Sequence, residues 1–273
     1  MTSLIFMVIY PEQSLQRHLE RSAHTDNVSI AYLLAWLRAK PDDHYLRLLL
    51  AQRFFDKGQI SESRKTLAPI FKITILDKKL RSKAEILLLD ILERQMWLFR
   101  PNTPEFLHAQ RNYLQQLRKI SHYQWPIERL EIFAKNAFAF GDTALAKELY
   151  YQLIYSAPAI NLQWFDRIAQ LYLAEGHYRA AARILFQAMP HTTSLQQRRS
   201  YFLAGVKALQ SGNLWPDAMS AAQTYAGVLL NDPTILEFLA RLALSANRPD
   251  LAQYYVSLLL QQRISPPATG VSP

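Results

Sequence analysis

The stretch AQLYLAEGHYRAA, residues 169–181, decides the fold class of this chain. Gly176 interrupts two segments that carry the apolar spacing of amphipathic helices. Small and aromatic residues, Ala169, Tyr172, Tyr178 and Ala181, flank this break at short intervals. Such a pattern predicts a helical hairpin, because small residues let paired helices approach closely and large residues fill the gaps between them.

Equivalent breaks recur along the chain at a nearly constant spacing. Gly141, Gly176, Gly212 and Asn247 each stand in one, separated by 35, 36 and 35 residues. An earlier copy, residues 50–67, has its turn at Gly58. A fixed period near ~34 residues with two helices in each period is typical of a helical solenoid.

The residues around these breaks resemble the tetratricopeptide repeat (TPR) family. Small residues recur before and after the turn: Ala134, Ala169, Gly205 and Ala240 before it, and Ala146, Ala181, Ala218 and Ala252 after it. The resemblance covers residues 45–72 and 126–262, and it implies an all-α, right-handed α-α superhelix of about six helix pairs. Between the two stretches we expect a lengthened, degenerate pair with helices over 76–99 and 104–120, and in front of the array helices near 11–22 and 27–39.

The expected domain organisation has three parts. Residues 1–10 include the apolar run Leu4–Tyr10 and form either an arm packed on the first helices or a residual membrane anchor. Residues 11–264 form the TPR-like helical-repeat domain, and residues 265–273, rich in proline, form a disordered tail. No run approaches the ~18 apolar residues that cross a bilayer.

Composition narrows the class of function. Only 7 of the 273 residues are Gly, which argues against glycine-rich phosphate loops. None is Cys, which excludes thiol chemistry. The seven His residues are scattered along the sequence and suggest no metal site. Glu128 and Glu131 share one helix face, whereas paired catalytic carboxylates must face each other across a substrate. We therefore predict no enzyme, no catalytic residue, no cofactor and no metal site.

Positive charge gathers in the first half of the chain. Residues 1–125 hold 19 Lys and Arg against 12 Asp and Glu, whereas residues 126–273 hold 12 against 10. The candidate basic patch consists of Lys78, Lys79, Arg81 and Lys83. It is either an ordinary solvated surface or a site for an acidic protein, an anionic membrane surface or nucleic acid, and nucleic acid ranks last because no RNA-binding motif accompanies it.

Two further surfaces are candidates for contact with a partner. In TPR arrays the first helix of each pair lines a concave groove, and the resemblance places the following residues there: Glu128, Glu131, Lys135, Phe138, Gln163, Asp166, Arg167, Gln170, Arg199, Phe202, Val206, Glu237 and Arg241. On the last helix, Leu251, Tyr255 and Leu258 form an apolar row beside the inner row Ala252, Val256 and Leu259. Since no further repeat follows, we expect this C-terminal edge to meet a second copy or another helix.

We therefore predict a non-enzymatic TPR scaffold that binds another protein or peptide segment through its concave groove and its C-terminal edge. The alternative is a membrane-associated component of a bacterial envelope assembly for polysaccharide export or secretion. It is suggested by a loose similarity over the first 60 or so residues, where an anchor would precede the array. The compartment, cytoplasmic or associated with the bacterial envelope, stays open at this point.

Overall fold

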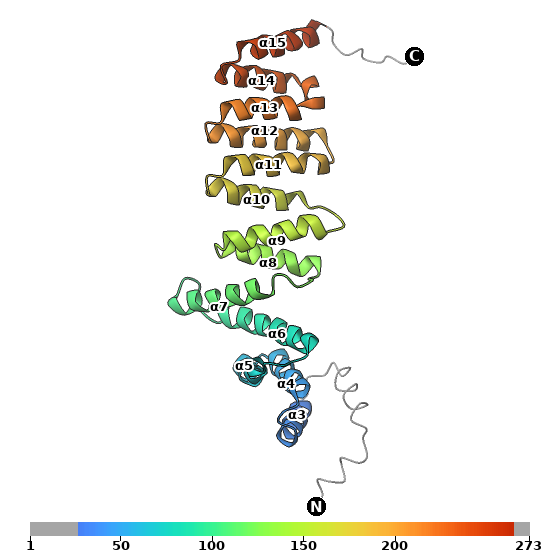
Figure 1. Ribbon diagram of the computed structural model, residues 1–273, viewed down its shortest axis with the longest axis vertical. Helices are drawn as coiled ribbons and strands as arrows, with labels where there is room; N and C mark the ends of the chain where they lie inside the picture. Colours follow the sequence, from blue (N-terminus) through green and yellow to red (C-terminus); the bar gives the residue numbers. More distant parts are fainter. Residues whose placement is uncertain (1–26, 265–273) are drawn as a thin grey trace, which may run out of the picture. The chain divides into compact units, whose positions relative to one another are not determined.

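The protein is entirely helical over the residues that its computed structural model describes, 27–264 (Figure 1). These residues form the α-helices α3 to α15 and three short 3₁₀ segments, with no strand among them. The predicted all-α fold is thereby confirmed. The arm at residues 1–10, the helix expected near 11–22 and the tail at 265–273 lie outside the described residues.

The chain divides into two compact units, Met1–Gln124 and Trp125–Pro273. The described helices of unit 1 are α3 (Asn27–Ala39), α4 (His44–Asp56), α5 (Ile60–Leu67), α6 (Lys78–Met96) and α7 (Pro104–Ile120), with η1 (Ala68–Lys72) after α5. Helix α4 packs on α5, and α6 packs on α7. The lengthened pair predicted between the two repeat stretches is α6 and α7.

Unit 2 repeats one helix pair four times within its described residues. Its helices are α8 (Ile127–Ala139), α9 (Thr143–Ser156), α10 (Leu162–Ala174), α11 (Tyr178–Ala188), α12 (Leu195–Ser211), α13 (Trp215–Tyr225), α14 (Pro233–Ser245) and α15 (Pro249–Ile264), with η2 (Met189–His191) and η3 (Gly227–Asn231) between pairs. Helices α9, α11 and α13 each contact the first helix of the next pair as well as their own partner, as a solenoid requires.

The turns within the described pairs, except that between α6 and α7, share one hydrogen-bond pattern. At Gly141 the turn residue donates its N–H to Phe138 at 3.2 Å, and Asp142 donates to Ala137 at 2.9 Å. The same two bonds occur around Gly58, Gly176, Asn213 and Asn247, and all five turn residues have positive φ. This is the Schellman motif, which satisfies the last carbonyl groups of a helix and favours glycine or asparagine.

Gly212 lies in the break between α12 and α13, as predicted, but it is not the left-handed residue of this turn. Gly212 has a φ of −89°, and the left-handed residue of the α12–α13 turn is Asn213, with a φ of 56°. Glycine is required at 212 for another reason, since a Cβ built there would lie 2.6 Å from the Tyr178 ring. Counted from Asn213, Ala218 falls at the same offset as Ala146, Ala181 and Ala252 in their own repeats.

The small residue after each turn lies in the core. Ala146, Ala181 and Ala218 are fully buried, and Ala252 is 6% exposed. In the α4–α5 pair Ser63 takes the same place, and its hydroxyl donates to the Ala51 carbonyl at 2.7 Å. A small side chain here lets the two helices of a pair approach, which is the packing role that the sequence pattern predicts.

Candidate partner-binding site

Most of the predicted groove residues, which lie on the first helices of the unit 2 pairs, are accessible to solvent. Those that are exposed are Glu128, Lys135, Gln163, Arg167, Gln170 and Arg241, and those that are partly buried are Glu131, Phe138, Asp166, Arg199 and Glu237. The described residues thus place eleven of the thirteen predicted groove residues at an accessible surface.

Phe202 and Val206 are the exceptions, because both are fully buried in the core. Their predicted place on the groove surface is wrong. The cause is the turn at Asn213, which shifts the register of α12 by one residue relative to the turn. The same offsets counted from Asn213 select Ser200, Leu203 and Lys207, none of which is buried.

Several groove residues join one first helix to the next. The Arg167 guanidinium of α10 lies 5.1 Å from the centre of the Phe138 ring on α8, and it also donates to Gln170 at 3.1 Å. On the following pair, Arg199 of α12 forms an ion pair with Asp232 at 2.9 Å. Asp232 is also the N-cap of α14, so this ion pair ties α12 to the start of α14.

A recess of about 450 Å³ opens between α10 and α12. Its wall combines apolar groups with amides, two hydroxyl groups and a carboxylate. The lining residues are Leu162, Gln163, Asp166, Leu185, Gln196, Gln197, Ser200, Tyr201 and Ala204. Mixed apolar and polar linings of this kind suit a peptide segment, because the apolar part gives affinity and the polar groups fix orientation.

The carboxylate of Asp166 is the charged group of this recess. Burial raises the pKa of Asp166 above its ordinary value, although a hydrogen bond with Tyr201 and the charge of Arg167 act in the opposite direction. Burial and the neighbouring Asp166 carboxylate raise the pKa of Tyr201, so its hydroxyl remains a donor. A partly desolvated acceptor such as Asp166 favours a ligand that brings a cationic or N–H donor group.

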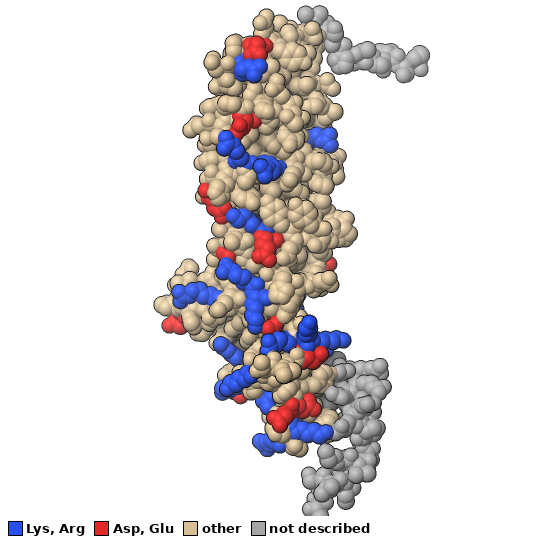
Figure 2. Space-filling model, in the orientation of Figure 1, with Lys and Arg blue, Asp and Glu red and all other residues tan. Residues whose placement is uncertain are grey.

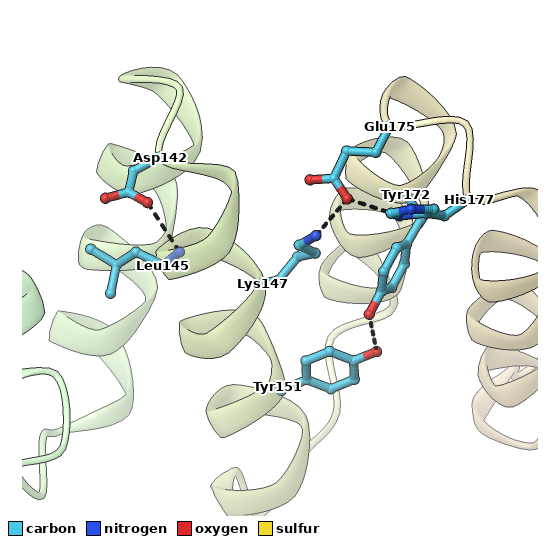
Figure 3. A network of polar contacts seen from close by, with 7 residues as sticks. All are labelled: Asp142, Leu145, Lys147, Tyr151, Tyr172, Glu175 and His177. Carbon is cyan, nitrogen blue, oxygen red and sulfur yellow. Dashed lines mark hydrogen bonds and ion pairs between the residues drawn. The ribbon is translucent and has the colours of Figure 1, made fainter.

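A second polar network lies where α9 meets the turn between α10 and α11 (Figure 3). Lys147 pairs with Glu175 at 2.6 Å, and His177 lies 3.2 Å from the same carboxylate. The hydrogen bond from Lys147 is the main cause that lowers the pKa of Glu175. The Tyr151 and Tyr172 hydroxyl groups lie 3.3 Å apart.

These residues join neighbouring helix pairs. Apart from Tyr172, residue types and spacing did not single them out, because the contacts cross between repeats.

In unit 1 the predicted basic patch lies at the start of α6. Lys78, Lys79 and Lys83 are exposed, whereas Arg81 is partly buried and donates to the Ile73 carbonyl at 2.9 Å. On the face of unit 1 shown in Figure 2, Lys and Arg clearly outnumber Asp and Glu. A recess of about 570 Å³ between α4 and α6 includes Lys83 together with Arg53 and Asp90.

The C-terminal edge differs from its prediction. Tyr255 is 3% exposed and belongs to the core, whereas Val256, assigned to the inner row, is 44% exposed. Leu251 and Leu258 are partly buried. The outer apolar residues of α15 are Tyr254, Val256 and Leu260, because the buried side of the helix that packs on α14 runs through Ala252 and Tyr255.

No helix among residues 27–264 is both long enough and apolar enough to cross a membrane. No three or more His, Asp or Glu side chains of these residues are grouped so that they could hold a metal ion.

Comparisons with known proteins give only weak structural likenesses. No family profile matches the chain, and no curated protein matches it. Among solved structures, a Podosopora anserina putative kinesin light chain with nearly identical TPR-like repeats is 16% identical, over 84% of this chain and 97% of that chain, with a TM-score of 0.34. A MamA RS-1 ArsTM double mutant is 14% identical, over 67% of this chain and 97% of that chain, with a TM-score of 0.33.

A third solved structure, the human IFIT1 dimer with PPP-AAAA, is 13% identical over 88% of this chain and 60% of that chain, with a TM-score of 0.25. These likenesses carry no information about a ligand or partner of the present protein. The class follows from the chain's own helix pairs, their Schellman turns and their buried small residues. The protein is a TPR-like helical-repeat protein, as the sequence pattern predicts.

Proposed function

We propose that the protein is a non-enzymatic scaffold that binds an extended segment of another protein on the first helices of unit 2. The observation that carries this proposal is the recess between α10 and α12, where Asp166 and Tyr201 lie beside the apolar Leu162 and Leu185. The segment would place an apolar side chain in the recess and a basic or N–H donor group at Asp166. No observation favours the polysaccharide-export alternative, which stays a prediction.

A library of displayed peptides, selected on the purified full chain, tests this proposal. We expect enriched peptides to combine an apolar residue with Lys or Arg, and to lose about tenfold or more in affinity to a Gln163→Arg/Ser200→Arg variant, whose long cationic side chains fill the recess. The matched control is Gln187→Arg/Ser220→Arg on α11 and α13, which adds the same charge at two exposed residues that do not line the recess.

Peptides that bind the wild type and both variants equally would contradict the proposed site. An enriched set without basic residues would contradict the role given to Asp166.

A further inference from the structure

The turn between α6 and α7 differs from every other turn within the described helix pairs. It is longer, and it exposes large apolar side chains: Leu98 is 70% exposed and Trp97 is 56% exposed. Leu107, in the first half of α7, is 45% exposed. In the view of Figure 1 this turn projects past the ends of the neighbouring helices of unit 1. Large apolar groups gathered at one projecting place mark an interaction surface.

The backbone holds these side chains in place. Trp97, Leu98 and Phe99 each donate their N–H to a carbonyl of the last turns of α6, at 3.2 to 3.3 Å. Across the pair, the centre of the Trp97 ring lies 5.7 Å from that of Phe106 on α7. The exposed apolar groups are therefore presented by an ordered turn, so their exposure is a feature of the folded protein.

Basic side chains surround this apolar tip. Arg64 and Lys65 of α5 share a recess of about 420 Å³ with Leu98, and Arg64 donates to Gln95 at 2.7 Å. Arg100 lies in the turn itself, and Arg94 and Arg111 lie one helical turn from Leu98 and Leu107 respectively. The nearby acidic groups are Glu62, which pairs with Lys65 at 3.1 Å, Glu93 and Glu105, so positive charge is in excess.

We propose that this Trp97 surface, formed by Trp97, Leu98, Leu107, Arg64, Lys65 and Arg100, docks the protein on an anionic lipid bilayer. Tryptophan and leucine partition into the boundary between headgroups and acyl chains, and each Lys or Arg near an anionic surface adds electrostatic attraction. Trp97 and Leu98 lie in the turn, and Leu98 also lines the recess with Arg64 and Lys65, so apolar and basic groups stand side by side. Charge complementarity favours an anionic bilayer over a zwitterionic one.

This surface is separate from the basic patch predicted from the sequence. Lys78 and Lys79 begin α6, whereas Trp97 follows its last residue, Met96. A helix of 19 residues separates its ends by about 28 Å. The two sites can therefore be tested independently, and neither depends on the recess between α10 and α12.

Sedimentation of the full chain with vesicles tests the proposal. We expect binding to vesicles of phosphatidylcholine mixed with phosphatidylglycerol, weaker binding at high salt, and little binding to phosphatidylcholine alone. A Leu98→Ser/Leu107→Ser variant should bind about tenfold more weakly, because two apolar groups no longer enter the interface. The matched control is Leu173→Ser/Leu195→Ser in unit 2, where the exposed fractions are 37% and 57%.

Because the chain contains no cysteine, a single Leu98→Cys variant can carry a polarity-sensitive fluorophore at one position. We expect its emission to shift to the blue when anionic vesicles are added, and that of a Leu195→Cys label to stay unchanged. Failure of the wild type to bind anionic vesicles at low salt would overturn the proposal.

Equal binding of Leu98→Ser/Leu107→Ser and wild type would also overturn it. Binding to soluble polyglutamate without binding to vesicles would point instead to an acidic protein and would equally overturn a lipid surface.

Discussion

Gly212 and Asn213 are adjacent residues of the α12–α13 turn that meet two different requirements: one needs a left-handed backbone and the other needs space beside a neighbouring side chain. Asn213 supplies the left-handed backbone of the turn, with a φ of 56°. Gly212 supplies space, because the Tyr178 atoms closest to a Cβ there are Cδ2, Cγ and Cβ, at 2.6 to 2.9 Å. These atoms lie close to the backbone of Tyr178, so they cannot easily move away from an added Cβ at position 212. At Gly176, by contrast, the requirement is conformational, since a Cβ there would meet nothing within 4 Å.

Substitution of these two glycines by asparagine should therefore have unequal effects. We expect Gly176→Asn to cost about 1 kcal/mol or less, because asparagine tolerates the left-handed conformation better than other residues do. Gly212→Asn should cost about 1–3 kcal/mol, because the new side chain forces the Tyr178 ring out of its packed position. Unfolding in urea, followed by circular dichroism, measures both, and equal losses would contradict the separate requirements.

At the scale of elements, the α6–α7 pair is held together by a buried carboxylate. Glu85 of α6 is 3% exposed and forms an ion pair with Lys119 at 2.8 Å. Tyr123, just after α7, donates to the same carboxylate, and Gln116 donates to the Glu85 carbonyl at 3.2 Å. Burial raises the pKa of Glu85, but the hydrogen bonds from Lys119 and Tyr123 and the charges of Lys119 and Arg81 outweigh it, so the pKa is lowered.

The lowered pKa of Glu85 predicts how stability depends on pH. The stabilisation is fully present above the pKa that a glutamate has in the unfolded chain, about 4.3, and it is lost as the pH falls through the folded-state pKa. Glu85→Gln should reduce the free energy of unfolding by about 1–3 kcal/mol at pH 7, because it removes the charge that Lys119 and Tyr123 contact.

The difference between Glu85→Gln and the wild type should shrink in acid, since the wild-type carboxyl is then protonated. Urea unfolding at a series of pH values measures it. The matched control is Glu105→Gln on α7, an exposed side chain that should change little. A difference between wild type and Glu85→Gln that is the same at every pH would contradict the role of the charge.

At the scale of the whole molecule, the described part of the array ends on α15 with an apolar outer side. Tyr254, Val256 and Leu260 are exposed by 51%, 44% and 53%. A repeat inside a solenoid would cover such a side with the next helix. Self-association through this edge stays a prediction. The buried Tyr255 is replaced in it by Val256 and Leu260, which lie one helical turn apart on the same side of α15.

Light scattering of the full chain tests self-association. We expect the wild type to form dimers, and Val256→Glu/Leu260→Glu to be monomeric, because two buried carboxylates would oppose the contact. Gln170→Glu/Gln187→Glu, at exposed positions of α10 and α11, is the matched control. Tyr255 is unsuitable for this test, since it is buried and its replacement would disturb the fold. A strictly monomeric wild type would show that the edge does not self-associate.

The sequence by itself determined the helix pairs, their turns and their period. The signals that set them are local: a Schellman turn joins residues six positions or fewer apart, and a helix repeats its own spacing. The helices predicted at 27–39 and 104–120 agree with α3 and α7 to the residue, and that predicted at 76–99 agrees with α6 to within three residues at each end. Even the shift in α12 had a signal, because Ala218 came one residue late when counted from Gly212.

Only the tertiary structure decided which side of each helix is covered and which distant side chains meet. Tyr255 rather than Val256 enters the core because α14 packs on that side of α15. Asp166 reaches Tyr201, and Glu85 reaches Tyr123, because helices from separate parts of the sequence are brought together. The exposure of Trp97 and Leu98 is decided in the same way, since apolar residues at the end of a helix are covered or exposed according to what packs beside them.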